Sequence, residues 1–202
     1  MSHEPNPPAG TLAAIVARAT GASPLDCYQC GRCAAGCPQN VPDEMDVSPT
    51  RIMHLLQLEA GFEGSSQAEG FALRALSSDT PWLCAGCQAC TTRCPQGVDI
   101  AGTMDVLCQE ALRRGAASRS KRARDIQALC SAFVNATSNR GRLHELSLVM
   151  AYKLRTGHLI QDALLGPAML KRGKMHILPG KAIDTQRVRR AAERLREKER
   201  EA

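Results

Sequence analysis

Apolar residues recur at helical spacing along most of the chain, with polar residues between them. The clearest case starts at Ser48-Pro49, a favoured N-cap followed by proline at the first helical position, and stops at Gly61. No stretch alternates apolar and polar residues with the Val, Ile and Thr content of a strand. The predicted fold class is therefore all-α. Further helices are expected at residues 69–76, from Asp99 or Gly102 through Leu112, at 121–136, at 143–154, and at 160–170 with an interruption at Gly166-Pro167.

The pattern divides the chain into four segments. Residues 1–20 are an N-terminal segment, 21–115 a core, 116–172 a helical extension that packs on the core or on partner subunits, and 173–202 a tail. The tail begins as an extended, partly apolar arm and continues from Thr185 as a charged segment, expected to be a solvated helix or a frayed end. Only 3% of the residues are aromatic, so the core must be built from Leu, Ala, Met and Val.

Charge is distributed unevenly between the two halves. Residues 1–110 hold 5 Lys and Arg against 12 Asp and Glu, whereas residues 111–202 hold 21 against 8. In the basic half only Phe133 and Tyr152 are available to stack on bases, and no helix-turn-helix or zinc-finger spacing occurs. Nucleic-acid binding is therefore not expected. Docking of basic helices on acidic partner surfaces, or plain solvation, is the preferred interpretation.

A repeat organises the first half of the chain. Residues 24–41 and 81–98 match at a constant offset of 57. Each copy contains four cysteines spaced Cys-x2-Cys-x2-Cys-x3-Cys-Pro, and flanking proline, glutamine and valine positions match as well. Clustering of this kind, in a chain without the cysteine density of a secreted disulfide scaffold, indicates metal binding.

This spacing is the one by which bacterial-type ferredoxins hold 4Fe-4S clusters. Three thiolates two residues apart wrap one face of a cubane, while the fourth, followed by proline, points away. In two-cluster proteins that fourth cysteine completes the other cluster. Because this crossing ties the loops together, loss of metal is expected to unfold the region. The predicted ligands are Cys27, Cys30, Cys33 and Cys94 for cluster 1, and Cys84, Cys87, Cys90 and Cys37 for cluster 2.

Other uses of the cysteines fit less well. Structural zinc is usually bound by Cys-x2-Cys pairs or with histidine, and the five histidines lie outside the motifs. Covalent haem needs Cys-x-x-Cys-His, which is absent, and disulfides are disfavoured in a reducing compartment. The two remaining cysteines, Cys108 and Cys130, lie in apolar helical patterns and are interpreted as buried core thiols.

The sequence also predicts a location. The first eight residues carry an acid and three prolines where a signal peptide needs basic residues and then an apolar stretch. Nowhere do 18 apolar residues run together. We therefore expect a cytoplasmic chain without direct membrane insertion, whose thiols stay reduced and free to bind metal.

Several segments in and around the motifs match a known pattern. They are Cys27-Tyr28-Gln29-Cys30-Gly31-Arg32-Cys33, Ser48-Pro49, Leu55-Leu56-Gln57-Leu58, Trp82-Leu83-Cys84 and Val98-Asp99-Ile100. With the other motif cysteines they resemble the C-type component of heterodisulfide reductase (HdrC), strongly over residues 24–112 and loosely beyond. The resemblance implies an α-helical ferredoxin with two 4Fe-4S cluster loops, followed by additional helices and a charged C-terminal tail.

By this resemblance the chain is an electron-transfer subunit and not itself a catalyst. It would relay electrons between an HdrA-like flavoprotein and an HdrB-like catalytic subunit in a hetero-oligomer, with FAD on a partner subunit only. The eight motif cysteines would be cluster ligands, and no residue would be catalytic. The chain has neither the adjacent Cys-Cys pairs of B-type subunits nor a Gly-x-Gly-x-x-Gly loop. Cluster potentials would be set by N–H to sulfur bonds, burial and local charge.

Two other functions remain open on the sequence alone. One is the iron–sulfur subunit of a flavin-dependent dehydrogenase, of the glycerol-3-phosphate or glycolate type, that feeds quinone; such chains often fuse this module to Cys-Cys repeats. The other is a structural role for the clusters, as in some nucleic-acid enzymes. The terminal substrate, the direction of electron flow and a doubling of the complex are not specified by the sequence.

Overall fold

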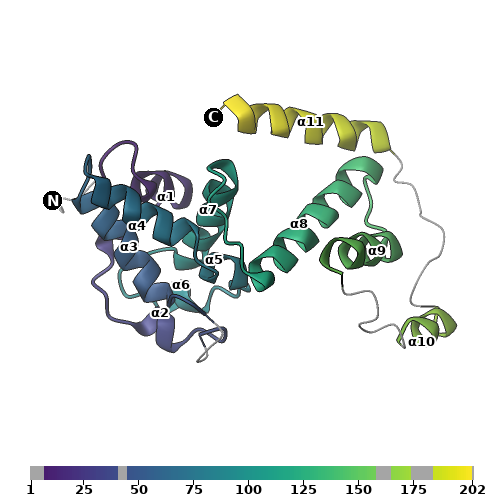
Figure 1. Ribbon diagram of the computed structural model, residues 1–202, viewed down its shortest axis with the longest axis horizontal. Helices are drawn as coiled ribbons and strands as arrows, with labels where there is room; N and C mark the ends of the chain where they lie inside the picture. The colour runs from purple at the N-terminus through teal and green to yellow at the C-terminus, as the bar shows by residue number, and fades with distance from the viewer. Residues whose placement is uncertain (1–6, 41–44, 158–164, 174–183, 202) are drawn as a thin grey trace. The chain divides into compact units, whose positions relative to one another are not determined.

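Every regular element of the computed structural model is a helix (Figure 1), over the residues that it describes: 7–40, 45–157, 165–173 and 184–201. The predicted all-α class is confirmed. The chain forms two compact units, Met1–Ala123 and Arg124–Ala202, which are described separately. No helix within the described ranges is both long enough and apolar enough to cross a bilayer.

The first unit consists of two halves with the same order of elements. Each half runs from a longer helix through a short helical turn and a four-residue helix to a second longer helix. The two four-residue helices are related by the same offset of 57 as the cysteine motifs, and the short turns before them match at that offset to within one residue. The longer helices on either side keep the same order but not that offset. The first half comprises α1 (Leu12–Thr20), η1 (Pro24–Asp26), α2 (Arg32–Ala35) and α3 (Pro49–Gly61), and the second α4 (Ser66–Leu76), α5 (Thr80–Leu83), α6 (Ala89–Thr92) and α7 (Ile100–Arg113).

Side-chain caps begin the two helices that follow the motifs, at residues predicted from the sequence. The Oγ atom of Ser48 accepts a hydrogen bond from the Arg51 N–H at 3.3 Å ahead of α3. The Oδ1 atom of Asp99 accepts one from the Gly102 N–H at 2.9 Å ahead of α7. Each bond satisfies an N–H group that has no partner inside its helix. Helix α4 begins at Ser66, slightly before its predicted start.

The longer helices enclose the core of the first unit. Helix α3 packs against α4, α1 packs against α3 and α7, and α4 packs against α7. The core is aliphatic, as predicted, and burial of each large side chain contributes about 1.5–3 kcal/mol. The largest fully buried aliphatic side chains are Leu12, Val16, Ile52, Met53, Leu56, Leu107 and Val98.

Helix α1 is not predicted from the sequence pattern and lies in the N-terminal segment. Its boundaries carry ordinary signals, because Thr11 caps the first turn and Gly21 ends the helix in a left-handed conformation. The contact that holds the start of α1 in place comes from a residue distant in sequence. The carboxylate of Glu59 on α3, which is 6% exposed, accepts hydrogen bonds from the N–H groups of Leu12 at 2.8 Å and Ala13 at 3.4 Å. A carboxylate distant in sequence thus satisfies the start of α1.

The second unit is built from helices near those predicted. Arg155 Nη1 donates a hydrogen bond to Ser131 Oγ at 2.6 Å and links α9 (Glu145–Thr156) to α8 (Lys121–Arg140). The predicted helices at 121–136 and 143–154 are confirmed, and the charged tail is helical. The elements are α8 (Lys121–Arg140), which begins in the first unit, α9 (Glu145–Thr156), α10 (Leu165–Lys171) and α11 (Thr185–Glu201).

One prediction beyond the core is wrong. Cys130 is exposed and is not a core thiol, because this face of α8, which also carries the exposed Phe133 and Val134, is uncovered in the described structure; Cys108 is partly buried. Pro167 is the third residue of α10, where N–H groups have no partner inside the helix, and the residues before Leu165 that would test the predicted interruption are not described. The start of the predicted 160–170 helix and most of the predicted arm lie outside the described residues.

Replacing Glu59 tests the anchor of α1. Glu59→Ala leaves two buried N–H groups without an acceptor and is expected to lower the free energy of unfolding by about 1–3 kcal/mol. Glu59→Gln keeps an acceptor oxygen and is expected to cost less. Anaerobic urea unfolding of the full chain measures both; equal losses for the two variants would contradict the role given to this carboxylate.

The difference in the free energy of unfolding between the wild type and Glu59→Gln should depend on pH. Burial raises the pKa of Glu59 above its ordinary value of 4.5, although the Leu12 and Ala13 N–H groups oppose the shift. The folded chain therefore binds this proton more tightly than the unfolded chain, and its contribution to stability is lost as the pH rises above 4.5. The stability of the wild type relative to Glu59→Gln should fall with rising pH, and an increase would contradict this.

Candidate metal centre

Both cysteine motifs fold into loops with the same backbone path. Each loop passes through two left-handed residues separated by one position: Gln29 and Gly31 in the first, and Gly86 and Gln88 in the second, with φ between 61° and 76°. These positions correspond at the offset of 57, with glycine and glutamine exchanged. Non-glycine residues adopt positive φ only rarely. The shared conformation therefore reflects the shape of the loop more than the residue that occupies it.

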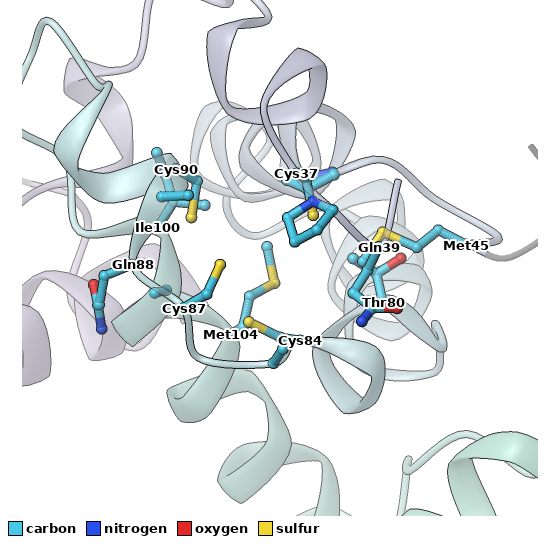
Figure 2. A pocket seen from close by; sticks show the side chains of 15 residues that line it. Cys37, Gln39, Met45, Thr80, Cys84, Cys87, Gln88, Cys90, Ile100 and Met104 are labelled. Atoms are coloured by element: carbon cyan, nitrogen blue, oxygen red, sulfur yellow. The ribbon is translucent and has the colours of Figure 1, made fainter. Parts of the chain in front are cut away.

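The second loop and one cysteine of the first line a cavity that is partly open to solvent (Figure 2). Its wall contains all four cysteines predicted for cluster 2, which we call site 2: Cys37, Cys84, Cys87 and Cys90. The rest of the wall is largely apolar and includes the starts of α3 and α7, with Pro49, Ile100, Ala101 and Met104. The structure thus gathers the predicted set, including the cysteine that is distant in sequence.

The four cysteines predicted for cluster 1 are also neighbours, and we call this set site 1. Burial raises the pKa of the Cys27 thiol, and the charges of Cys33, Cys94 and Cys30 raise it further. Cys94 comes from the second motif, so the exchange seen at site 2 occurs here in the opposite direction. Cys33 is buried, and its Sγ lies 3.2 Å from the hydroxyl of Thr50 at the start of α3.

Site 2 has a different set of polar neighbours. Burial raises the pKa of the Cys84 thiol, and the charges of Asp105, Cys37 and Cys87 act in the same direction. Burial also raises the pKa of Cys90, opposed by hydrogen bonds from Thr91. The Thr91 hydroxyl has a further use, because it donates to Asp99 Oδ1 at 3.0 Å and accepts from the Ala101 N–H at 3.2 Å.

The donor sets fit a cluster better than a single ion. A single zinc ion holds its sulfur ligands at about 2.3 Å, which brings the sulfurs within about 4 Å of one another. Among the described residues, no three His, Cys, Asp or Glu side chains are grouped closely enough to hold one ion. The thiols of site 2 instead surround a cavity with a mostly apolar wall. Four cysteine thiols around such a cavity match the ligand set of a 4Fe-4S cluster.

Arg93 lies at the contact between the two cysteine loops, which we call the seam. Gly36 and Arg93 occupy equivalent positions in the two motifs, each just before the fourth cysteine. Helices α2 and α6 are in contact, and a Cβ added to Gly36 would lie 1.9 Å from Nη1 of Arg93. A side chain at position 36 would therefore require the flexible side chain of Arg93 to move. Arg93 also shares a shallow hollow with Arg32 and Cys94.

A glutamine of α3 braces the first loop. The Nε2 atom of Gln57 donates to the carbonyl oxygens of Pro24 at 3.2 Å and Cys27 at 2.5 Å. Its Oε1 atom accepts a hydrogen bond from Nε2 of Gln29, one of the left-handed residues, at 2.7 Å. Sequence reasoning gives no role to Gln57, Thr50, Thr91 or Arg93. A lone amide among the leucines that surround Gln57 is the one local signal that points to such a brace.

Comparison with known proteins agrees with this arrangement. The family model described as a 4Fe-4S dicluster domain matches residues 26–98. The chain is 30% identical over 96 residues to the C-type iron-sulfur subunit of the CoB-CoM heterodisulfide reductase of Methanopyrus kandleri, a match that covers 48% of this chain and 43% of that protein. It is 30% identical over 100 residues to the C-type subunit of the ferredoxin:CoB-CoM heterodisulfide reductase of Methanosarcina mazei, with coverage of 50% and 53%. The chain spans about half the length of these curated relatives.

The seam can be tested with a double-mutant cycle. Gly36→Ala places a Cβ where the Arg93 guanidinium lies, so it is expected to cost about 1 kcal/mol of unfolding free energy. In an Arg93→Ala background the same substitution should cost clearly less, because the clash is gone. Urea unfolding of the four anaerobically purified chains gives the coupling energy. An equal cost of Gly36→Ala in both backgrounds would contradict the contact.

Proposed function

We propose that the chain is a member of the HdrC-like family of 4Fe-4S dicluster proteins and the electron-transfer subunit of a heterodisulfide reductase-like complex, which its similarity to C-type subunits supports. One observation carries the proposal: the thiol of Cys37 lines the same cavity as Cys84, Cys87 and Cys90 from the other motif. Such an exchange is the arrangement by which two-cluster ferredoxins bring both clusters close together. Neighbouring clusters are the means of moving electrons through a chain that has no other redox group.

The residues that would hold each cluster follow from this arrangement. When bound, a 4Fe-4S cluster accepts and returns single electrons. The chain's own side chains hold it, limit access of water and set the charge around it. Ile100 and Met104 provide the buried wall of site 2, and Thr50 contacts the buried Cys33 of site 1. We assign Cys27, Cys30, Cys33 and Cys94 to site 1, and Cys84, Cys87, Cys90 and Cys37 to site 2.

Partners are required because the chain carries no group for the terminal chemistry. It has no adjacent Cys-Cys pair and no Gly-x-Gly-x-x-Gly loop. The relatives are named as C-type subunits, which supports a multisubunit complex for this chain too. We place FAD on an A-type flavoprotein and catalysis on a B-type subunit. The reducing cytoplasm is the location in which eight clustered thiols remain available for iron.

Anaerobic purification of the tagged full chain, followed by mass spectrometry of the proteins that remain bound, tests the proposed complex. A flavoprotein of A type together with a B-type chain rich in Cys-Cys pairs is the expected result. The control is the same purification from cells that express the untagged chain. Recovery of a substrate-specific flavin dehydrogenase of the glycerol-3-phosphate or glycolate type, without those two proteins, would contradict the proposal and support a quinone-linked function.

A further inference from the structure

The side chains around the two sites would stabilise an added negative charge to different extents. Reduction of a 4Fe-4S cluster adds one electron, so hydrogen bonds to its thiolates and nearby positive charges raise the reduction potential, and nearby carboxylates lower it. The two cysteine loops share one backbone path, so side chains around them can be compared directly. Three differences are visible, and all three have the same sign.

The first difference is a hydroxyl. At site 1, the Thr50 Oγ1 lies 3.2 Å from Sγ of the buried Cys33. Thr50 is the second residue of α3, and the second residue of α7, which faces site 2, is Ala101. At site 2, the Thr91 hydroxyl bonds the thiol of Cys90, and it also donates to the Asp99 carboxylate at 3.0 Å. Each site therefore has one threonine hydroxyl beside a thiol, but the hydroxyl at site 2 is shared with a carboxylate, which leaves less of it for a thiolate.

The second difference is positive charge. Arg32 and Arg93 share a hollow with Cys94, a thiol of site 1, and the charge of Arg32 also acts on the neighbouring Tyr28. Neither arginine forms an ion pair with a carboxylate in the described part of the chain. Asp26, which precedes Cys27, lines a separate hollow. Arg93 also lies against Gly36, the residue before Cys37 of site 2, so its charge does not distinguish the sites. The charge of Arg32 is available to the cluster held at site 1.

The third difference is negative charge. Asp105 is exposed on α7 one residue after Met104, which lines the cavity of site 2, and its carboxylate acts on Cys84. The Asp99 carboxylate caps the same helix and holds Thr91, next to Cys90. Asp46 bonds the hydroxyl of Thr80, which also lines this cavity, at 3.2 Å. Site 2 is thus bordered by carboxylates, whereas the hollow beside Cys94 is bordered by arginines.

We propose that these side chains give the cluster held at site 1 a more positive reduction potential than the cluster held at site 2. This rests on the proposed function and adds a direction to it: within the chain, one electron passes from the reduced cluster at site 2 to the oxidised cluster at site 1. The donor to site 2 is a reduced group on a partner. Each site has one exposed cysteine, Cys30 at site 1 and Cys87 at site 2. With this order of potentials, the acceptor belongs at the edge of site 1 formed by Cys30 and by Tyr28, which is 55% exposed.

A redox titration of the anaerobically purified full chain, followed by electron paramagnetic resonance, tests the order. Arg32→Gln and Thr50→Val are expected to lower the more positive of the two midpoint potentials, and Asp105→Asn to raise the more negative one. Each change should alter the equilibrium constant for reduction by about two- to tenfold, where tenfold corresponds to about 59 mV for one electron. Arg32 and Asp105 are not buried in the core, so the folded chain tolerates both substitutions.

Matched controls come from α4. Arg74→Gln and Glu69→Gln remove exposed charges of the same two signs and are expected to shift neither potential. The inference is overturned if the wild type shows one unresolved midpoint, if Arg32→Gln acts on the more negative potential, or if Asp105→Asn acts on the more positive one. Failure of the proposed function has a different signature, because a chain whose clusters cannot be reduced at all would not be a relay.

Discussion

The exchange of one thiol between the two cysteine loops is the constraint on which the rest of the first unit depends. Cys37 leaves its own loop to join three thiols of the other, and Cys94 does the reverse. Both loops must therefore approach each other at the residues just before these cysteines. Gly36 leaves room for this contact, because the side chain of Arg93 lies where a Cβ of Gly36 would be.

The helices hold this seam from outside. The starts of α3 and α7 supply the wall of site 2, and their caps, Ser48 and Asp99, set where each helix begins. Gln57 on α3 pins the first loop through two carbonyl oxygens, and Glu59, two residues further along, pins α1. The aliphatic core is therefore not the only source of order in the first unit. Gln57 and Glu59 extend from the packed helix α3 and fix the first cysteine loop and α1 by hydrogen bonds.

Periodicity and spacing predict much of this arrangement. The motif cysteines, the caps of α3 and α7 and the all-helical class follow from patterns that lie within a few residues of one another. What escapes prediction depends on contacts between distant residues. Helix α1 is completed by Glu59, 47 positions from Leu12, and the fit of Arg93 over Gly36 exists only once the loops have met. The prediction that Cys130 is buried is wrong for a related reason. An apolar helical pattern shows which face of a helix could be buried, but not whether another element covers it.

The crossing of the ligands is tested most directly by the electron paramagnetic resonance spectrum of the reduced full chain carrying Cys37→Ser. The account predicts that this substitution alters the signal of the cluster that Cys87→Ser alters, and leaves intact the signal that Cys33→Ser alters. Cys130→Ser, at an exposed cysteine of α8, is the control and should change neither. If Cys37→Ser instead alters the same signal as Cys33→Ser, each motif holds its own cluster and the account is contradicted.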